Sequence, residues 1–274
     1  MICPVRDVPV YYETYGQGIP VLCIHGYSLD HRVMTGCLEP VFAQEASYRR
    51  IYVDLPGRGK TPSAAWINNA DDLLALVTAF IQTVIPEGRF LLIGESYGGY
   101  LSMGLLRAMP QRIDGVMMIC PGIFKNAGKE NPAKCLLWES EDFKGIQNDA
   151  AAESFLRIAV VATPDIFQQY ETYILSGITL ADQEFLARYG NGGYWFSFDE
   201  ELRALHFDKP SCILAGRQDH VAGYHAAYEM LECFPRATFA VLDCAGHNLQ
   251  FENEPLFSQH VKDWLWRVGL QNES

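Results

Sequence analysis

Near-continuous apolar runs alternate with longer amphipathic stretches along most of the chain. The runs at 20–25, 50–54 and 90–94 hold few polar residues and many β-branched or aromatic side chains. Because a strand with one solvated face alternates apolar and polar residues, such runs are typical of strands that are buried on both faces. Regular alternation with helix-like stretches indicates β-α units. The sequence therefore predicts an α/β fold with a doubly wound, mostly parallel sheet.

The same patterns place the individual elements. Residues 8–15 alternate in part, which predicts an antiparallel strand near the start of the chain. The other expected strands are 20–25, 50–54, 90–94, 115–120, 211–215 and 238–242, and the expected helices are 71–85, 97–109, 221–234 and 255–268.

The alternation of strand-like and helix-like segments stops between about 123 and 207. There, aromatic-rich helical segments are interrupted by prolines and glycines. We expect residues 123–207 to form an inserted helical cap, a lid on a core domain made of residues 1–122 and 208–274. Most aromatic side chains of the cap, taken singly, are expected to form its own core. Three are expected to line a substrate pocket: Trp138, Tyr170 and Trp195.

Length and charge limit the classes of protein to which the chain can belong. The 274 residues suit one large domain with an insertion better than two separate domains. A net charge of -12 disfavours nucleic acid and anionic membranes as partners, so we expect a small-molecule substrate. The first residues lack a basic segment followed by an apolar one, so a cytoplasmic protein is expected. The sequence leaves the oligomeric state open.

The cysteines and the glycines do not indicate a cofactor. The eight cysteines are dispersed among apolar runs without a Cys-x-x-Cys pair, as expected of small buried thiols. No His-Glu-x-x-His or Gly-x-Gly-x-x-Gly pattern occurs. We therefore expect neither a metal nor an organic cofactor.

The most informative motif is Gly94-Glu95-Ser96-Tyr97-Gly98-Gly99, between an expected strand and an expected helix. A serine on such a sharp turn exposes its hydroxyl, and the flanking glycines allow chain segments to approach closely. The start of the helix directs free N–H groups toward developing negative charge. Ser96 is thus the candidate nucleophile, and the Tyr97 N–H is one candidate oxyanion donor.

A serine hydroxyl needs a base, and the base needs a carboxylate to orient it. His247 follows the last expected strand, on a loop at the carboxyl end of the sheet, and Asp219 follows the strand at 211–215. The order Ser, Asp, His also fits. His220 is the closest rival, but it adjoins Asp219, and neighbours on a turn seldom point the same way. After the first buried strand, His25-Gly26 precedes Tyr27, whose N–H is the second candidate oxyanion donor. His25 itself is expected to be structural.

Five ordered motifs resemble the α/β-hydrolase superfamily in its cap-bearing, single-domain branch: His25-Gly26, the loop 54–61, Gly94 to Gly99, Gly216 to Asp219, and Gly246-His247. The resemblance covers nearly the whole length and implies an eight-stranded sheet and cofactor-free acyl transfer through an acyl-enzyme. The loop carries Arg58 where many relatives have His. Serine at position 96, rather than aspartate, argues against the dehalogenase and epoxide-hydrolase branches.

Several functions share this predicted triad. A dry, aromatic-lined pocket favours a carboxylic-ester hydrolase for small or medium apolar esters. Hydrolysis of a carbon–carbon bond, or of an amide by an aminopeptidase-like enzyme, needs the same residues. A non-catalytic small-ligand sensor is the alternative of another class, and the intact triad argues against it.

Overall fold

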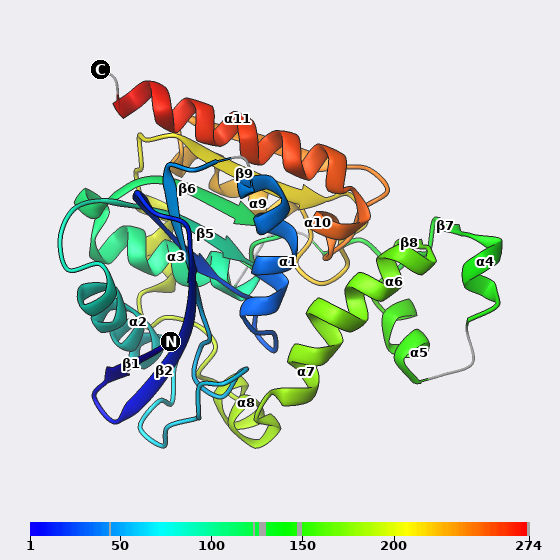
Figure 1. Cartoon of the computed structure of the whole chain (residues 1–274), viewed down its shortest axis with the longest axis horizontal. Helices are drawn as coiled ribbons and strands as arrows, with labels where there is room; N and C mark the ends of the chain where they lie inside the picture. Colours follow the sequence, from blue (N-terminus) through cyan, green and yellow to red (C-terminus); the bar gives the residue numbers. More distant parts are fainter. Residues whose placement is uncertain (44, 123, 126–129, 147–149, 273–274) are drawn as a thin grey trace.

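The computed structural model describes residues 1–43, 45–122, 124–125, 130–146 and 150–272. At its centre lies an eight-stranded sheet with the strand order β1-β2-β4-β3-β5-β6-β9-β10 (Figure 1). The strands are β1 (Ile2–Val5), β2 (Val8–Tyr15), β3 (Ile19–Ile24), β4 (Tyr48–Val53), β5 (Phe90–Glu95), β6 (Ile113–Ile119), β9 (Ser211–Gly216) and β10 (Ala237–Leu242).

Strand pairing follows the prediction. The strand β2 pairs antiparallel with β1 and β4, and the pairs from β4 through β10 are parallel. The predicted doubly wound, mostly parallel eight-stranded sheet is therefore confirmed. Because parallel strands end at one edge of the sheet, the loops after β3, β5, β9 and β10 gather there.

Both faces of the sheet are buried, each by its own helices. In β3, Leu22 and Ile24 face one apolar core, whereas Val21 and Cys23 face the other. The first core is covered by α2 and α3 and the second by α1 and α11. This arrangement explains the near-continuous apolar runs. The helices outside the insertion are α1 (His31–Phe42), α2 (Ala70–Val84), α3 (Tyr97–Ala108), α9 (His225–Glu229), α10 (Leu249–Glu252) and α11 (Glu254–Asn272).

Several elements, among them β1, α1 and α10, were not expected from the sequence, and one expected helix is wrong in extent. The edge strand β1 is only four residues long, and α1 carries Pro40 in its interior, which weakens the helical pattern. The helix expected at 221–234 begins only at His225 and continues as a 3₁₀ turn over Met230–Cys233. The Asp219 carboxylate accepts the N–H groups of residues 221 and 222, and Gly223 has a φ of 70°, so this stretch turns instead.

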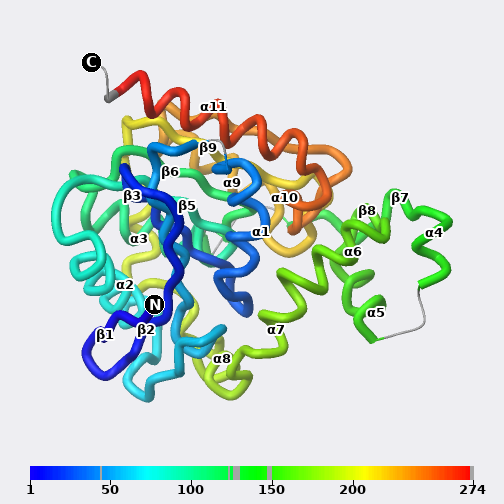
Figure 2. Tube along the Cα trace, in the orientation of Figure 1, coloured from blue at the N-terminus to red at the C-terminus, as the bar shows by residue number. Residues whose placement is uncertain are grey.

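Between β6 and β9 the chain leaves the sheet, as Figures 1 and 2 show for the green segment. We call residues 120–210 the β6–β9 insert. Its outer helices α4 and α5 lie furthest from the sheet, and α6, α7 and α8 lead back toward it (Figure 1). Its elements are β7 (Trp138–Glu139), α4 (Glu141–Lys144), α5 (Ala150–Leu156), β8 (Val161–Ala162), α6 (Pro164–Tyr170), a π-helical turn (Glu171–Leu175), α7 (Ser176–Leu180), α8 (Gln183–Gly190) and a 3₁₀ helix (Asp199–Ala204).

The outer part of the β6–β9 insert has a small aromatic core of its own. Phe143 packs against Phe155 and Phe167, with ring centroids 5.4 and 5.5 Å apart. These rings fix α4, α5 and α6 to one another, as expected for most of the aromatic residues here. The cap boundaries at 123 and 207 stay predictions, and residue 123 lies outside the described residues.

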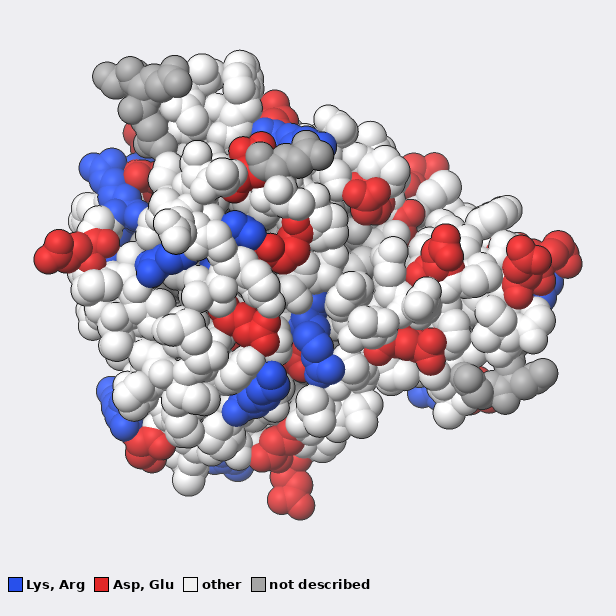
Figure 3. Space-filling model, in the orientation of Figure 1, with Lys and Arg blue, Asp and Glu red and all other residues white. Residues whose placement is uncertain are grey.

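In the part of the chain that the structure describes, no helix combines the length and apolar character that crossing a bilayer requires. Acidic and basic side chains are mixed over the face shown in Figure 3, consistent with a net charge spread over the surface.

Candidate active site

Ser96 occupies the turn between β5 and α3, in a backbone conformation that few residues other than glycine adopt. Its φ is 50° and its ψ is -114°. The Ser96 N–H donates to the Ile119 carbonyl at 2.8 Å, which ties the turn to the neighbouring strand β6. A side chain held in this strained geometry projects from the sharp turn rather than along the strand or the helix.

The glycines around Ser96 are required by close backbone contacts. A Cβ atom on Gly94 would lie 2.4 Å from the Gly98 carbonyl oxygen, and one on Gly98 would lie 2.1 Å from the Ile24 carbonyl oxygen. Real Cβ atoms do not approach an oxygen this closely, so any larger residue would push α3 away from β3 or open the turn. The Gly-x-Ser-x-Gly spacing is therefore a packing requirement of this turn.

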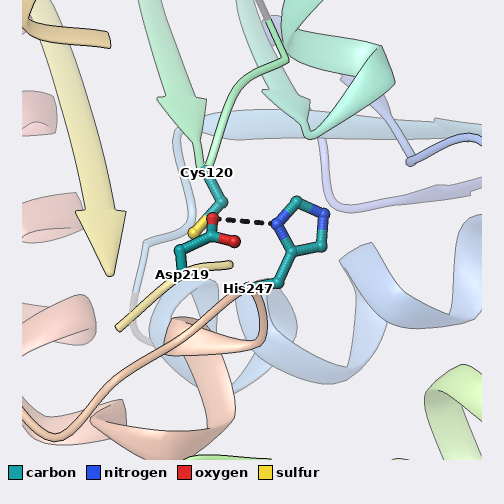
Figure 4. A group of neighbouring side chains, drawn as sticks. All are labelled: Cys120, Asp219 and His247. Carbon is teal, nitrogen blue, oxygen red and sulfur yellow. Dashed lines mark hydrogen bonds and ion pairs between the residues drawn. The ribbon is translucent and has the colours of Figure 1, made fainter. Parts of the chain in front are cut away.

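The structure brings Ser96, His247 and Asp219 together in one line of hydrogen bonds. His247 Nε2 lies 2.9 Å from Ser96 Oγ, and His247 Nδ1 lies 2.9 Å from Asp219 Oδ2. His247 comes from the loop between β10 and α10, and Asp219 from the loop after β9. Figure 4 shows the imidazole directed at the Asp219 carboxylate. The three residues predicted from the sequence thus meet at the carboxyl edge of the sheet.

Charges and hydrogen bonds hold Asp219 ionised beside His247. Burial alone would raise the pKa of Asp219, but the His247 charge and hydrogen bond, with two main-chain N–H donors, lower it. Burial alone would lower the pKa of His247, whereas attraction to Asp219 and the hydrogen bond between them raise it to about 9. The carboxylate also fixes the ring so that Nε2 faces Ser96.

The other two histidines near the motif do not contact Ser96. His25 Nδ1 is 2.7 Å from the Gly26 carbonyl oxygen, and His25 Nε2 accepts the Leu55 N–H at 3.0 Å. Burial lowers the pKa of His25 to about 4, so the ring is neutral and holds two loops together, which agrees with its predicted structural role. Among the described residues, His220 Nδ1 has no hydrogen-bond partner, and the imidazole that contacts Ser96 is that of His247.

Two main-chain N–H groups near Ser96 remain free to bind a ligand oxygen. Within the described residues, the N–H groups of Tyr27 and Tyr97 donate to no protein acceptor. Tyr97 is the first residue of α3, where an N–H has no partner within the helix. Both groups are therefore available where the sequence analysis expected oxyanion donors.

A cavity of about 480 Å³ opens onto Ser96 and His247. Its walls are largely apolar, and the β6–β9 insert supplies several of them. Residues from the loops of the sheet include Gly26, Tyr27, Glu95 and Asn248, and those from the insert are Ser154, Arg157, Ile158, Tyr170, Ile174, Ile178 and Tyr194.

Of the three pocket residues predicted from the sequence, only Tyr170 lines this cavity. The prediction was wrong for Trp138, whose side chain is 55% exposed on the outer strand β7. It was also wrong for Trp195, which packs edge-on against Tyr100 at 5.2 Å. Aromatic content alone does not show which face of a short insert element turns toward the sheet. Tyr194, which precedes Trp195 in the chain, lines the cavity instead.

Two residues that support the site, Arg58 and Glu95, were not predicted from the sequence. Arg58 is fully buried and donates to the carbonyl oxygens of Tyr27 at 2.6 Å and Pro56 at 2.7 Å. It thereby fixes the loop that carries the Tyr27 N–H. Glu95 lies beside Ser96 with its carboxyl group buried. Only the departure from the usual histidine at position 58 gave a signal in the sequence.

Cys120, Asp219 and His247 offer ligand atoms within 4.8 Å of one another, and so do Asp30, His31 and Asp54. In the first group, shown in Figure 4, the thiol lies beside the carboxylate. Burial raises the pKa of the Cys120 thiol well above its usual value, so it stays protonated. A hydrogen bond already holds the histidine of each group, since His247 Nδ1 lies 2.9 Å from Asp219 Oδ2 and His31 Nδ1 lies 2.8 Å from Asp54 Oδ1.

The chain is similar to known proteins over most of its length. A model of the alpha/beta hydrolase family matches residues 21–259. Among curated proteins, the chain is 24% identical to a 2-hydroxy-6-oxononadienedioate/2-hydroxy-6-oxononatrienedioate hydrolase of Paraburkholderia phymatum, covering 94% of this chain and 91% of that protein. It is also 24% identical to a pimeloyl-[acyl-carrier protein] methyl ester esterase of Legionella pneumophila, with coverage of 93% and 99%. The similarity therefore extends over whole chains.

A solved structure gives the same result for the fold. An alpha/beta superfamily hydrolase from Oenococcus oeni PSU-1 superposes with a TM-score of 0.88 at 28% identity, over 95% of this chain and 96% of that one. Because the superposition covers 95% of this chain, it includes most of the β6–β9 insert.

Proposed function

The chain belongs to the alpha/beta hydrolase family, and we propose that it is a serine hydrolase whose nucleophile is Ser96, with His247 as base and Asp219 as the group that orients the base. The observation that carries this proposal is the line of two 2.9 Å hydrogen bonds from Ser96 Oγ through His247 to Asp219. An isolated serine hydroxyl near neutral pH is a poor nucleophile, and this contact provides the proton acceptor that it needs.

In the first half-reaction, Ser96 Oγ attacks the carbonyl carbon of the substrate while its proton passes to His247 Nε2. The negative charge on the former carbonyl oxygen is stabilised by the N–H groups of Tyr27 and Tyr97. When the tetrahedral intermediate collapses, the bond to the leaving group breaks and the leaving group takes the proton from His247. The acyl group remains on Ser96.

In the second half-reaction, water attacks the acyl carbonyl carbon and gives a proton to His247 Nε2. The bond to Ser96 Oγ then breaks, and the serine regains its proton from His247. Asp219 keeps the imidazole in place and stabilises its positive form in both halves. The products are a carboxylic acid and the protonated leaving group.

For the substrate, we propose a carboxylic ester with a small or medium acyl chain. The largely apolar cavity of about 480 Å³ has room for such a chain and few polar groups to hold a peptide. We further infer that the predicted cap, residues 123–207, acts as a lid, since Tyr170, Ile174 and Ile178 form one wall of the cavity.

A second candidate is hydrolysis of a carbon–carbon bond next to a ketone. The Paraburkholderia phymatum protein named as a 2-hydroxy-6-oxononadienedioate hydrolase supports it, and the name of the Legionella pneumophila protein supports an ester. The side chain of Arg157, on the cavity wall, would suit a substrate that carries a carboxylate. Both candidates use the same three residues.

The test is a series of p-nitrophenyl esters with acyl chains of increasing length, offered to the native protein and to Ser96→Ala, with folding checked by circular dichroism. We expect turnover that peaks at a short or medium chain and is lost in Ser96→Ala. Decay of 2-hydroxy-6-oxononadienedioate absorbance tests the second candidate in parallel. Ester turnover that survives in Ser96→Ala would refute the role of Ser96.

A further inference from the structure

Glu95 is a second carboxyl group beside the Ser96–His247 pair. It is the last residue of β5, only 1% exposed, and lies in the wall of the cavity. Its Oε1 atom is 3.9 Å from His247 Nε2, the nitrogen that faces Ser96. Asp219 contacts the other ring nitrogen at 2.9 Å. The imidazole therefore lies between two buried carboxyl groups.

The Glu95 carboxyl group lacks the partners that usually accompany a buried acid. Within the described residues, neither of its oxygens makes a hydrogen bond of normal distance and angle, although the Gly26 N–H is close enough to lower the pKa of Glu95. The main chain of Gly26 lies close to it, since a Cβ atom there would lie 2.4 Å from Glu95 Oε2. Burying a carboxylate without an opposite charge beside it costs free energy of folding. When His247 is protonated, its ring is the group best placed to offset this cost for Glu95.

The titratable groups around this pair come from several elements. They are Asp219 and His220 after β9, Glu252 in α10, Cys37 in α1, Cys120 after β6 and Tyr194 in the insert. Burial lowers the pKa of His220 below its usual value, which favours its neutral form, and burial keeps the two thiols and the phenol protonated. The imidazolium form of His247 is thus the one cation among the groups that interact with Glu95 in the described part of the chain.

We propose that Glu95 is a positioning residue that acts through His247, stabilising the imidazolium that forms when Ser96 gives up its proton. The proposal rests on the serine mechanism above. Glu95 neither gains nor loses a proton in the step: the proton moves from Ser96 Oγ to His247 Nε2 and then to the leaving group. The ionised carboxylate lowers the energy of the charged ring while this proton is in transit.

This role has a consequence for the pH dependence. Burial raises the pKa of Glu95 to about 7, and the charge on His247 works against that rise. Conversely, the Glu95 charge is one of the causes that raise the pKa of His247 to about 9. The carboxylate that stabilises the imidazolium should therefore also add to the effect of Asp219 and move the acid limb of the activity to higher pH.

The experiment is kcat/KM for the best ester between pH 5 and 10 in the native protein, Glu95→Gln and Glu95→Asp, with Glu153→Gln, an exposed residue of α5, as the matched control. In Glu95→Gln we expect the acid limb to move down by about 1 pH unit or more, and the alkaline plateau to fall by about tenfold. Glu95→Asp should restore part of both, and Glu153→Gln should match the native profile.

An acid limb that stays in place in folded, active Glu95→Gln would overturn the proposal. If Glu95→Gln does not fold, an unchanged acid limb in Glu95→Asp would overturn it instead. Activity that persists in Ser96→Ala would refute the serine mechanism, whereas Ser96-dependent activity with an unmoved acid limb would refute the role of Glu95 alone.

Discussion

The strained turn at Ser96 depends on single atoms of the residues around it. Ser96 has a positive φ, and the missing side chain at Gly98 lets the start of α3 lie against the end of β3. The strain persists because the hydrogen bond from Ser96 to Ile119 and the packing of α3 hold the turn in place. We therefore expect one added methyl group at Gly98 to displace the turn and separate Ser96 Oγ from His247 Nε2.

We predict that Gly98→Ala destabilises the protein by about 1–3 kcal/mol and removes most ester turnover, because its Cβ atom would lie 2.1 Å from the Ile24 carbonyl oxygen. Urea unfolding and kcat measure the two effects. The control is Gly269→Ala in α11, where the new methyl group meets open space and stability should stay equal or rise slightly. Equal stability and activity in both variants would show that the turn is not tightly constrained.

Among the secondary-structure elements, α10 links the β6–β9 insert to the loop of His247. One oxygen of Glu252 accepts the Val160 N–H at 2.6 Å, and the other accepts the Gly246 N–H at 2.6 Å. Gly246 directly precedes His247, so the insert and the proposed base are held by the same carboxylate. The helix α10 thereby couples the position of the β6–β9 insert to that of the proposed base.

We predict that Glu252→Gln lowers the free energy of unfolding by about 1–3 kcal/mol, because its amide nitrogen must face one of two main-chain N–H groups. It should also lower kcat/KM by loosening the histidine loop. Chemical unfolding and ester kinetics provide the measurements, with Glu153→Gln again as the control, which should change stability by less than about 0.5 kcal/mol. A Glu252→Gln variant as stable as this control would contradict the linking role.

Most elements that surround the site could be predicted from the sequence, because strands buried on both faces leave near-continuous apolar runs. The line Ser96, Asp219 and His247 was also predictable from motifs that follow such strands. The pocket was not: Trp138 and Tyr170 look equivalent in the sequence, yet one is on the outer strand β7 and the other faces the cavity. How the insert is held against the sheet depends on contacts such as the hydrogen bond from Val160 to Glu252, made far along the chain.

At the scale of the whole molecule, stability depends on buried groups that join the loops at the carboxyl edge of the sheet. His25, after β3, accepts the Leu55 N–H and lies against the Gly26 carbonyl, which only a neutral ring can do. Its pKa of about 4 in the folded protein is below the ordinary value of 6.5, so the unfolded chain takes up the proton first as the pH falls. The stabilisation is complete above about pH 6.5 and is lost as the pH approaches 4.

We therefore predict that His25 contributes up to about 3 kcal/mol to the pH dependence of unfolding between pH 6.5 and 4. The native free energy of unfolding should fall more steeply over this range than that of His25→Gln, which can keep both hydrogen bonds without titrating. Urea titrations at four or five pH values give both slopes. Parallel slopes would mean that His25 does not bind its proton more weakly in the folded state.

The activated state of Ser96 is tested most directly by covalent labelling with a fluorophosphonate, followed by mass spectrometry of the intact protein and its peptides. The phosphorus atom should bond to Ser96 Oγ as fluoride leaves, giving one adduct that maps to Ser96. It should be absent in Ser96→Ala and slowed by about 10³-fold or more in His247→Ala. A folded native protein that stays unlabelled, or that is labelled at another residue, would contradict the proposal that Ser96, His247 and Asp219 act together.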